Sequence, residues 1–233
     1  MNSLLIIHPF VLPCNIMFCK NTTRGNILEA AKTRFLHYGY AKTTMAEIAA
    51  DCKMSAGNLY RYFASKLDIA EAIAQESMDE IGLKLREVVK KQGVSAKDKL
   101  RQMLFLTMQL TYHSLESDRR IFEMAQVIMV ERPEFANKQL AHERSMLAEI
   151  LSAGNASNEF AVQDVVFTAE MIQSASMKFR YPQLHSRLTY DKLERELAGV
   201  LALILNGLDD GGAVTQGQAK NIATQPADVA FSI

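Results

Sequence analysis

The sequence lacks the features that would point to a secreted or metal-binding protein. Its 233 residues include no tryptophan, five prolines and three cysteines, and the formal net charge is zero. The cysteines, Cys14, Cys19 and Cys52, are odd in number and follow neither a disulfide framework nor a zinc-site spacing. We therefore expect no bound metal and a reducing, cytoplasmic location.

Signatures of common catalytic sites are also absent from the sequence. It contains no P-loop, dinucleotide fingerprint or nucleophile elbow, and His142-Glu143 lacks the second histidine of a metalloprotease helix. His113 and His142 are more simply surface or core residues than metal ligands. We expect neither an enzyme nor a cofactor.

Residues 1–20 form an apolar leader of uncertain status. A signal peptide would have a basic start and a small-residue cleavage site, whereas this segment has neither and is interrupted by Pro9 and Pro13. It is also short for a membrane span. We interpret it as a loose leader, or as the result of a start placed too early with Met17 as the alternative, and we expect no membrane association.

Charge is distributed unevenly along the chain despite the balanced total. The segment from Lys20 to Lys66 contains eight basic and three acidic residues, although the whole chain has 26 of each sign. A basic N-terminal module on an acidic remainder indicates an anionic partner for that module alone.

The hydrophobic pattern has a helical period nearly throughout, which predicts an all-α protein. We expect an N-terminal three-helix domain at 21–66, a larger helical domain at 67–208 and a flexible Gly/Gln/Ala-rich tail at 209–233. The expected helices lie at about 24–38, 45–52, 55–63, 66–92, 95–115, 118–132, 133–152, 160–181 and 191–207.

The second and third helices have the signals of a helix-turn-helix. Thr44 with Glu47 predicts a capping box, and Ser55 predicts the cap of the third helix. On a helical wheel Leu59 and Phe63 face the core, whereas Gly57, Asn58 and Arg61 lie on the opposite side. This small, polar and basic outer face is typical of a helix that enters the DNA major groove.

The stretch "TTMAEIAADCKMSAGNLYRYFASK" resembles the DNA-binding motif of the TetR/AcrR transcriptional regulators over about residues 24–75. The resemblance implies that Thr43 and Thr44 lie against the DNA backbone. It implies base contacts from Ala56, Gly57 and Asn58, phosphate contacts from Tyr60, Tyr62 and Lys66, and a phosphate or minor-groove contact from Arg24. The full expected DNA-binding set is Arg24, Thr43, Thr44, Ser55, Ala56, Gly57, Asn58, Tyr60, Arg61, Tyr62 and Lys66.

One position in the motif departs from the family. A small residue and then glycine usually separate the second and third helices, whereas this chain has Cys52 and Lys53. We expect Lys53 to adopt a left-handed backbone conformation, at a cost of about 1 kcal/mol.

Methionines are frequent between residues 100 and 180. Methionine fills irregular space, so these residues fit an ordinary core or the wall of a ligand cavity. The resemblance implies a pocket for a small apolar effector in the larger domain. The candidate pocket residues are Met103, Met108, Tyr112, His113, Met124, Met129, Met146 and Gln173.

The last two expected helices have wide apolar faces. These faces fit an intrachain core or, as the resemblance implies, a four-helix interface in a homodimer. The candidate interface residues are Val165, Ala169, Ile172, Ala175, Phe179, Leu197, Leu201 and Ile204.

Together these patterns predict a dimeric repressor that a small apolar ligand releases from a palindromic double-stranded DNA operator. The alternative is a helical ligand-binding or adaptor protein that acts without DNA. The basic module and the polar outer face of the third helix favour the first interpretation.

Overall fold

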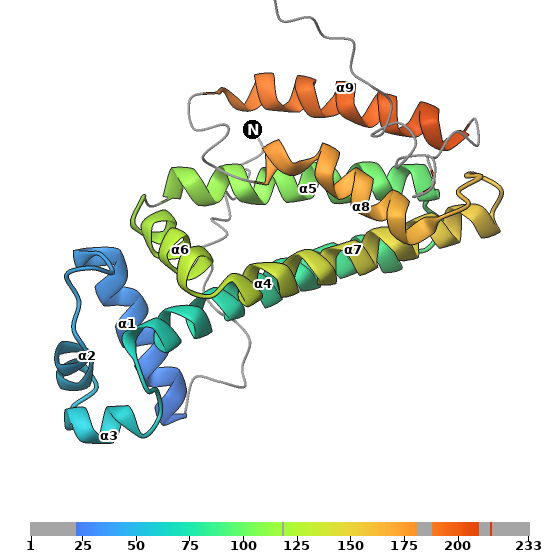
Figure 1. Ribbon diagram of the computed structural model, residues 1–233. Helices are drawn as coiled ribbons and strands as arrows, with labels where there is room; N and C mark the ends of the chain where they lie inside the picture. The colour runs from blue at the N-terminus through green and yellow to red at the C-terminus, as the bar shows by residue number, and fades with distance from the viewer. Residues whose placement is uncertain (1–21, 118, 181–187, 210–214, 216–233) are drawn as a thin grey trace, which may run out of the picture. The chain divides into compact units, whose positions relative to one another are not determined.

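The computed structural model describes residues 22–117, 119–180, 188–209 and 215 (Figure 1). This part of the chain is helical and contains no strand, which confirms the predicted all-α fold class. The expected leader and, apart from Asp209 and Thr215, the expected tail lie outside the described residues. The helices are α1 (Thr23–Tyr38), α2 (Met45–Asp51), α3 (Ala56–Tyr60), α4 (Lys66–Lys90), α5 (Ala96–Ser117), α6 (Arg119–Glu131), α7 (Pro133–Ala156), α8 (Val165–Ala175), the 3-10 helix η1 (Met177–Phe179) and α9 (Tyr190–Asp209).

Short-range hydrogen bonds start and stop the first helices. The Thr22 side chain caps α1, which ends at Gly39 with a φ of 89°. The predicted capping box is present at α2, where Thr44 accepts from the Glu47 amide and the Glu47 carboxylate accepts from the Thr44 amide. These bonds satisfy amides that a helix start otherwise leaves unpaired.

The chain folds as two compact units. Among the described residues, the helix-turn-helix unit comprises those up to 85 and those of 107–141, and the C-terminal unit comprises those of 86–106 and those from 142 onward. Each of α4, α5 and α7 contributes residues to both units. These units are divided after residues 85, 106 and 141. The domain boundary expected near residue 66 remains a prediction.

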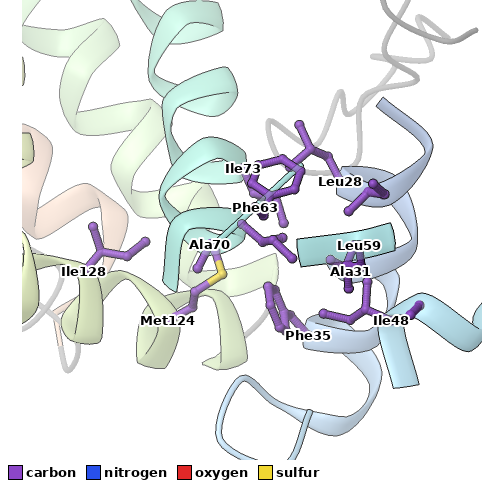
Figure 2. Packing of buried hydrophobic residues seen from close by; sticks show 13 residues of the cluster. Leu28, Ala31, Phe35, Ile48, Leu59, Phe63, Ala70, Ile73, Met124 and Ile128 are labelled. Atoms are coloured by element: carbon purple, nitrogen blue, oxygen red, sulfur yellow. The ribbon is translucent and has the colours of Figure 1, made fainter. Parts of the chain in front are cut away.

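One apolar cluster forms the core of the helix-turn-helix unit (Figure 2). One face of α1 contributes Ile27, Leu28, Ala31 and Phe35, and helices α2, α3, α4 and α6 pack their own side chains against it. Met124 of α6 lies in this cluster and is 4% exposed, and its expected place in a ligand pocket remains a prediction. The buried members are Ile27, Leu28, Ala31, Phe35, Ile48, Ala49, Leu59, Phe63, Ile69, Ala70, Ile73, Met124 and Ile128.

Two arginines at the ends of α6 form hydrogen bonds and ion pairs with other helices of the same unit. Arg120 donates to the carbonyls of Leu36 and His37, which are carbonyls at the C-terminal end of α1. Such carbonyls favour a cation, because they carry the negative end of the helix dipole. At the other end, Arg132 pairs with two acids of the first turns of α4.

The C-terminal unit differs from expectation at the start of its last helices. A helix from 160 to 181 was expected, but α8 spans only Val165–Ala175 because Asp164 caps it by accepting from the Phe167 amide. Thr189, rather than the expected Asp191, caps α9 by accepting from the Lys192 amide at 3.4 Å. Each helix therefore begins directly after a side chain that accepts a hydrogen bond from an amide of the first helical turn.

Polar side chains are buried in the C-terminal unit together with their partners. Arg144 donates to the Gln173 side-chain oxygen at 3.2 and 3.3 Å. Arg180 and Glu143 form an ion pair whose side chains are only 8% and 12% exposed. Among the helices described, none is long and apolar enough to cross a bilayer.

Candidate nucleic-acid interface

Helix α3 presents the outer face that the wheel predicts, although it is shorter than expected. Ser55 caps it by accepting from the Asn58 amide at 3.2 Å, and Leu59 and Phe63 are buried at 0% and 5% exposure. Gly57 is exposed, and a Cβ placed on it would meet nothing within 4 Å. The fold therefore leaves the space above Gly57 open.

Aromatic and basic side chains surround this open position. Tyr60 and Tyr62 are 53% and 43% exposed, and Arg61 between them is also exposed. Arg24 is exposed on α1, with its guanidinium 4.9 Å from the Phe63 ring centroid. Hydroxyl and guanidinium donors at the rim of a shallow helix face can bind phosphates on both sides of a groove.

The turn between α2 and α3 has the predicted backbone strain. Lys53 has a φ of 54°, in the left-handed region where glycine is favoured. The neighbouring Cys52 is half-buried, and this burial raises the pKa of its thiol. Cys52 is therefore a packed side chain in this turn.

The two threonines that were expected to lie against DNA differ in exposure. Thr44 is exposed at the start of α2, and its phosphate contact remains a prediction. Thr43 is 1% exposed, and its hydroxyl donates to the Gly39 carbonyl at 3.0 Å. The prediction for Thr43 is corrected, because a buried and hydrogen-bonded side chain does not face a ligand.

Lys66 is half-buried and turned toward the protein. Its ammonium donates to the carbonyls of Tyr40 and Thr43, both at 2.8 Å. Burial lowers the pKa of the Lys66 ammonium, because desolvation disfavours the charged form. The expected phosphate contact of Lys66 remains untested, and the internal hydrogen bonds were not foreseen.

An arginine that the sequence reasoning did not single out pairs with two of the three acids in the basic segment. Arg34 on α1 forms ion pairs with Asp51 and, at 3.4 Å, with Glu47. The hydrogen bond from Arg34 lowers the pKa of Asp51, and hydrogen bonds from Thr44 lower the pKa of Glu47. Arg34 thus pairs with two of the three acidic side chains in the segment from Lys20 to Lys66. The seven other basic residues of that segment therefore leave it with an excess of positive charge.

The candidate pocket residues are placed in different surroundings. Met129 is 38% exposed, and its expected place in a cavity remains a prediction. Met108, Tyr112 and His113 belong to the helix-turn-helix unit, whereas Met103, Met146 and Gln173 belong to the C-terminal unit. For these six residues the pocket remains a prediction. No group of three or more metal-ligating side chains occurs among the described residues.

Most candidate dimer residues face the interior of their own chain. Ala169, Ile172, Phe179, Leu197 and Leu201 are buried, so their assignment to an intermolecular interface is corrected to intrachain core. Val165 and Ile204 are half-buried, and Ala175 is exposed.

The outer faces of α8 and α9 carry different residues from those expected. Val166 is 65% exposed, and Leu203 is 75% exposed beside the exposed small residues Ala198, Gly199 and Ala202. The spacing of these small residues along α9 is the signal that could have identified this face from the sequence.

Comparison with protein families assigns both parts of the chain. The family model described as bacterial regulatory proteins of the tetR family matches residues 27–73, and the model of the tetracyclin repressor-like C-terminal domain matches residues 96–201. The chain belongs to the TetR/AcrR family of transcriptional regulators. The match of the first model, over residues 27–73, covers the helix-turn-helix described above.

Individual TetR/AcrR relatives match more limited regions. The uncharacterized HTH-type regulator YfiR of Bacillus subtilis is 35% identical over 77 residues, which cover 33% of this chain and 38% of YfiR. The HTH-type transcriptional repressor KstR2 of Mycobacterium tuberculosis is 32% identical over 69 residues, which cover 30% of this chain and 34% of KstR2. The aligned region thus spans little more than a third of these relatives.

A likeness in fold extends over most of the chain. The structure of SmeT, the repressor of the Stenotrophomonas maltophilia efflux pump SmeDEF, aligns with a TM-score of 0.58 over 84% of this chain and 95% of SmeT. The sequence identity is 19%, so this likeness shows the fold alone.

Proposed function

We propose that this TetR/AcrR family member is a DNA-binding transcriptional regulator that represses its target genes. The outer face of α3 carries the proposal: an exposed glycine with open space above it, flanked by two exposed tyrosines and an arginine. A helix with this profile can approach base edges closely while its rim binds phosphates. The relatives KstR2 and SmeT are named as repressors, which favours repression.

The proposed assembly is a homodimer on a palindromic operator. A two-fold dimer places two recognition helices about one turn of DNA apart, near 34 Å, and therefore reads two half-sites. The exposed Val166 of α8 and Leu203 of α9 form the proposed contact, since the small residues beside Leu203 allow close helix approach.

The proposed effector is a small, apolar molecule bound among the methionine-rich helices. Methionine side chains adapt to ligands of different shape, and Met103, Met108 and Met146 are fully or almost fully buried. Two solved proteins with a similar fold hold small ligands: SmeT is in complex with triclosan, and RolR is in complex with resorcinol. An effector releases DNA only to the extent that it binds the DNA-free state more tightly.

This proposal needs no catalytic group and no cofactor beyond the effector. The proposed partners are double-stranded operator DNA, the effector and a second copy of the chain, without a membrane. Because the DNA partner is genomic, the proposed location is the cytoplasm.

Selection of duplex DNA from a random pool by the purified protein tests the function. We expect an enriched palindrome, bound at least about a thousandfold more tightly than unrelated DNA at physiological salt. An Arg61→Gln variant should lose affinity for the selected sequence while retaining its helicity. Enrichment of no sequence would refute the proposal and favour an adaptor that acts without DNA.

A further inference from the structure

Helix α2 ends in a hydrogen-bonded turn of a kind that usually contains glycine. The Lys53 amide donates to the Ala50 carbonyl at 3.0 Å, and the Met54 amide donates to the Ala49 carbonyl at 2.9 Å. These two bonds form a Schellman motif, whose left-handed residue is most often glycine because a Cβ is crowded there. In this chain Lys53 occupies that position, with a φ of 54°.

The residues that follow Lys53 have clear roles within the fold, whereas the Lys53 side chain has none. Met54 packs against the core of the helix-turn-helix unit, and Ser55 caps α3. The Lys53 side chain is exposed, and within the part of the chain that the structure describes it forms no hydrogen bond or ion pair. No side-chain contact among these residues therefore offsets the strain of a left-handed lysine.

The acidic side chains of the preceding helix are already paired with another base. Helix α2 contains two acids, Glu47 and Asp51, and Arg34 of α1 forms ion pairs with both. Asp51 is only two residues from Lys53, yet its carboxylate accepts two hydrogen bonds from Arg34. The positive charge of Lys53 is therefore available to an anion outside the chain.

The turn lies at the edge of the proposed DNA-binding face, between α2 and α3 (Figure 1). In a helix-turn-helix complex the first helix crosses the phosphate backbone, and the N-terminal residues of the second helix enter the major groove. In the proposed complex the turn that joins these helices therefore lies beside the backbone at the edge of the groove. Lys53 is two residues before the Ser55 cap, and its flexible four-carbon stem extends the reach of the ammonium.

We propose that Lys53 donates to a DNA phosphate beside the N-terminus of α3. The inference rests on the proposed DNA-binding function and adds a residue that the expected DNA-binding set does not contain. Strained backbone conformations persist where a side chain is needed for function, and a left-handed lysine at a position that favours glycine fits this rule. The contact strengthens binding to every sequence, because a phosphate carries no sequence information.

The salt dependence of DNA binding tests this contact. Each neutralised phosphate contributes about 0.9 to the slope of log K against log salt, so one contact in each half-site contributes about 2. We compare the wild type with Lys53→Gly on the duplex that the wild type selects. We expect the variant to bind about tenfold more weakly near 50 mM salt and almost equally near 200 mM, because a slope lower by about 2 changes the affinity ratio roughly tenfold over this range.

The competing role for Lys53 is local to the helix end. A cation after the last turn of α2 meets the negative end of the helix dipole. This role predicts a lower melting temperature for Lys53→Gly and an unchanged slope. The proposal predicts an unchanged or higher melting temperature, since glycine suits the left-handed backbone, together with the lower slope. An unchanged slope would overturn the proposal, whatever the melting temperature.

Three further variants separate the phosphate contact from other effects of the substitution. Lys138→Ala removes an exposed lysine of α7, outside the helix-turn-helix, and should leave the slope unchanged. An equal fall there would assign the effect to net charge and refute the contact. Lys53→Arg keeps the charge and should keep the slope, so a fall as large as that of Lys53→Gly would also refute it. Lys53→Asn removes the charge and tolerates the left-handed conformation, so it replaces Lys53→Gly if that variant does not fold.

The proposed contact and the proposed function fail in different ways. A wild-type protein that binds no duplex would refute DNA binding itself and, with it, the contact. Intact operator binding with the same slope in the wild type and Lys53→Gly would refute only the contact of Lys53.

Discussion

The outer faces of α3 and α9 differ in what they expose. On α3 the exposed positions are small, polar or amphipathic, and the buried Leu59, with Phe63 just after the helix, contributes the apolar contacts. On α9 an aliphatic side chain, Leu203, is 75% exposed although the helix already buries Leu193, Leu197 and Leu201. The first face suits a hydrated, charged partner, and the second suits another apolar surface.

Two ion pairs, one in each unit, differ in how far solvent reaches them. Arg34 meets Asp51 and Glu47 at the surface, where solvent weakens the attraction. Arg180 meets Glu143 with both side chains almost fully buried. Removal of one partner therefore has a small cost at the first site and a large cost at the second, where solvent does not replace the lost partner.

The largest expected effect follows from this buried pair. Glu143→Leu should lower the free energy of unfolding by about 3–5 kcal/mol, because it leaves the Arg180 guanidinium buried without its carboxylate. Urea titration monitored by circular dichroism measures the change. Addition of Arg180→Met should recover at least half of the loss.

The matched control for that prediction is Glu149→Leu, which breaks the ion pair with Arg86 at a carboxylate that is 52% exposed. A change below about 1 kcal/mol is expected there. Equal losses at Glu143 and Glu149 would show that burial does not distinguish the two pairs.

The next largest effect concerns the outer face of α9. Leu203→Glu should raise the dimer dissociation constant about a hundredfold, since two like charges would meet across the two-fold axis at a cost of several kcal/mol. Sedimentation velocity measures the assembly, and far-ultraviolet circular dichroism should show unchanged helicity. Leu83→Glu places the same charge on another exposed leucine and should leave the dimer intact. Wild-type monomers at micromolar concentration would contradict the proposed interface.

A smaller effect is expected at Gly57, where the fold and the proposed DNA contact make opposite demands. Gly57→Ala should stabilise the protein by about 0.5–1 kcal/mol, because alanine loses less backbone entropy in a helix and its Cβ meets open space. Operator affinity should fall several-fold, and further for Gly57→Val. A lower melting temperature for Gly57→Ala, with affinity falling in proportion, would mean that the fold itself requires glycine.

The smallest effect concerns pH. The hydrogen bond from Arg34 lowers the pKa of Asp51 below its ordinary value, so this carboxylate stabilises the fold above about pH 4 and loses that contribution as the pH falls through its folded pKa. Carboxyl-detected NMR titration measures the pKa directly. Arg34→Met should move the Asp51 pKa back toward the ordinary value, whereas an unchanged pKa would assign the shift to another group.

The start of each early helix could be predicted from the sequence because capping is local. Thr44 with Glu47, Ser55 with Asn58 and Ser65 with Asp68 are each three residues apart, and their hydrogen bonds form within one turn. The outward position of Gly57 and the left-handed Lys53 follow from the same short-range geometry.

The tertiary structure decided what covers each apolar or polar group. Met124 joins the core of the helix-turn-helix through side chains more than 50 residues away, and Lys66 meets carbonyls 23 and 26 residues earlier. The apolar residues of α8 and α9 show that both helices pack against something, but periodicity does not tell a chain's own core from a second copy. The sequence by itself determined the caps of α2 and α3 and the outer face of α3, because these depend on neighbours within one or two turns. The partners of Lys66 and Met124 depend on distant segments, and only the folded chain brings those segments together.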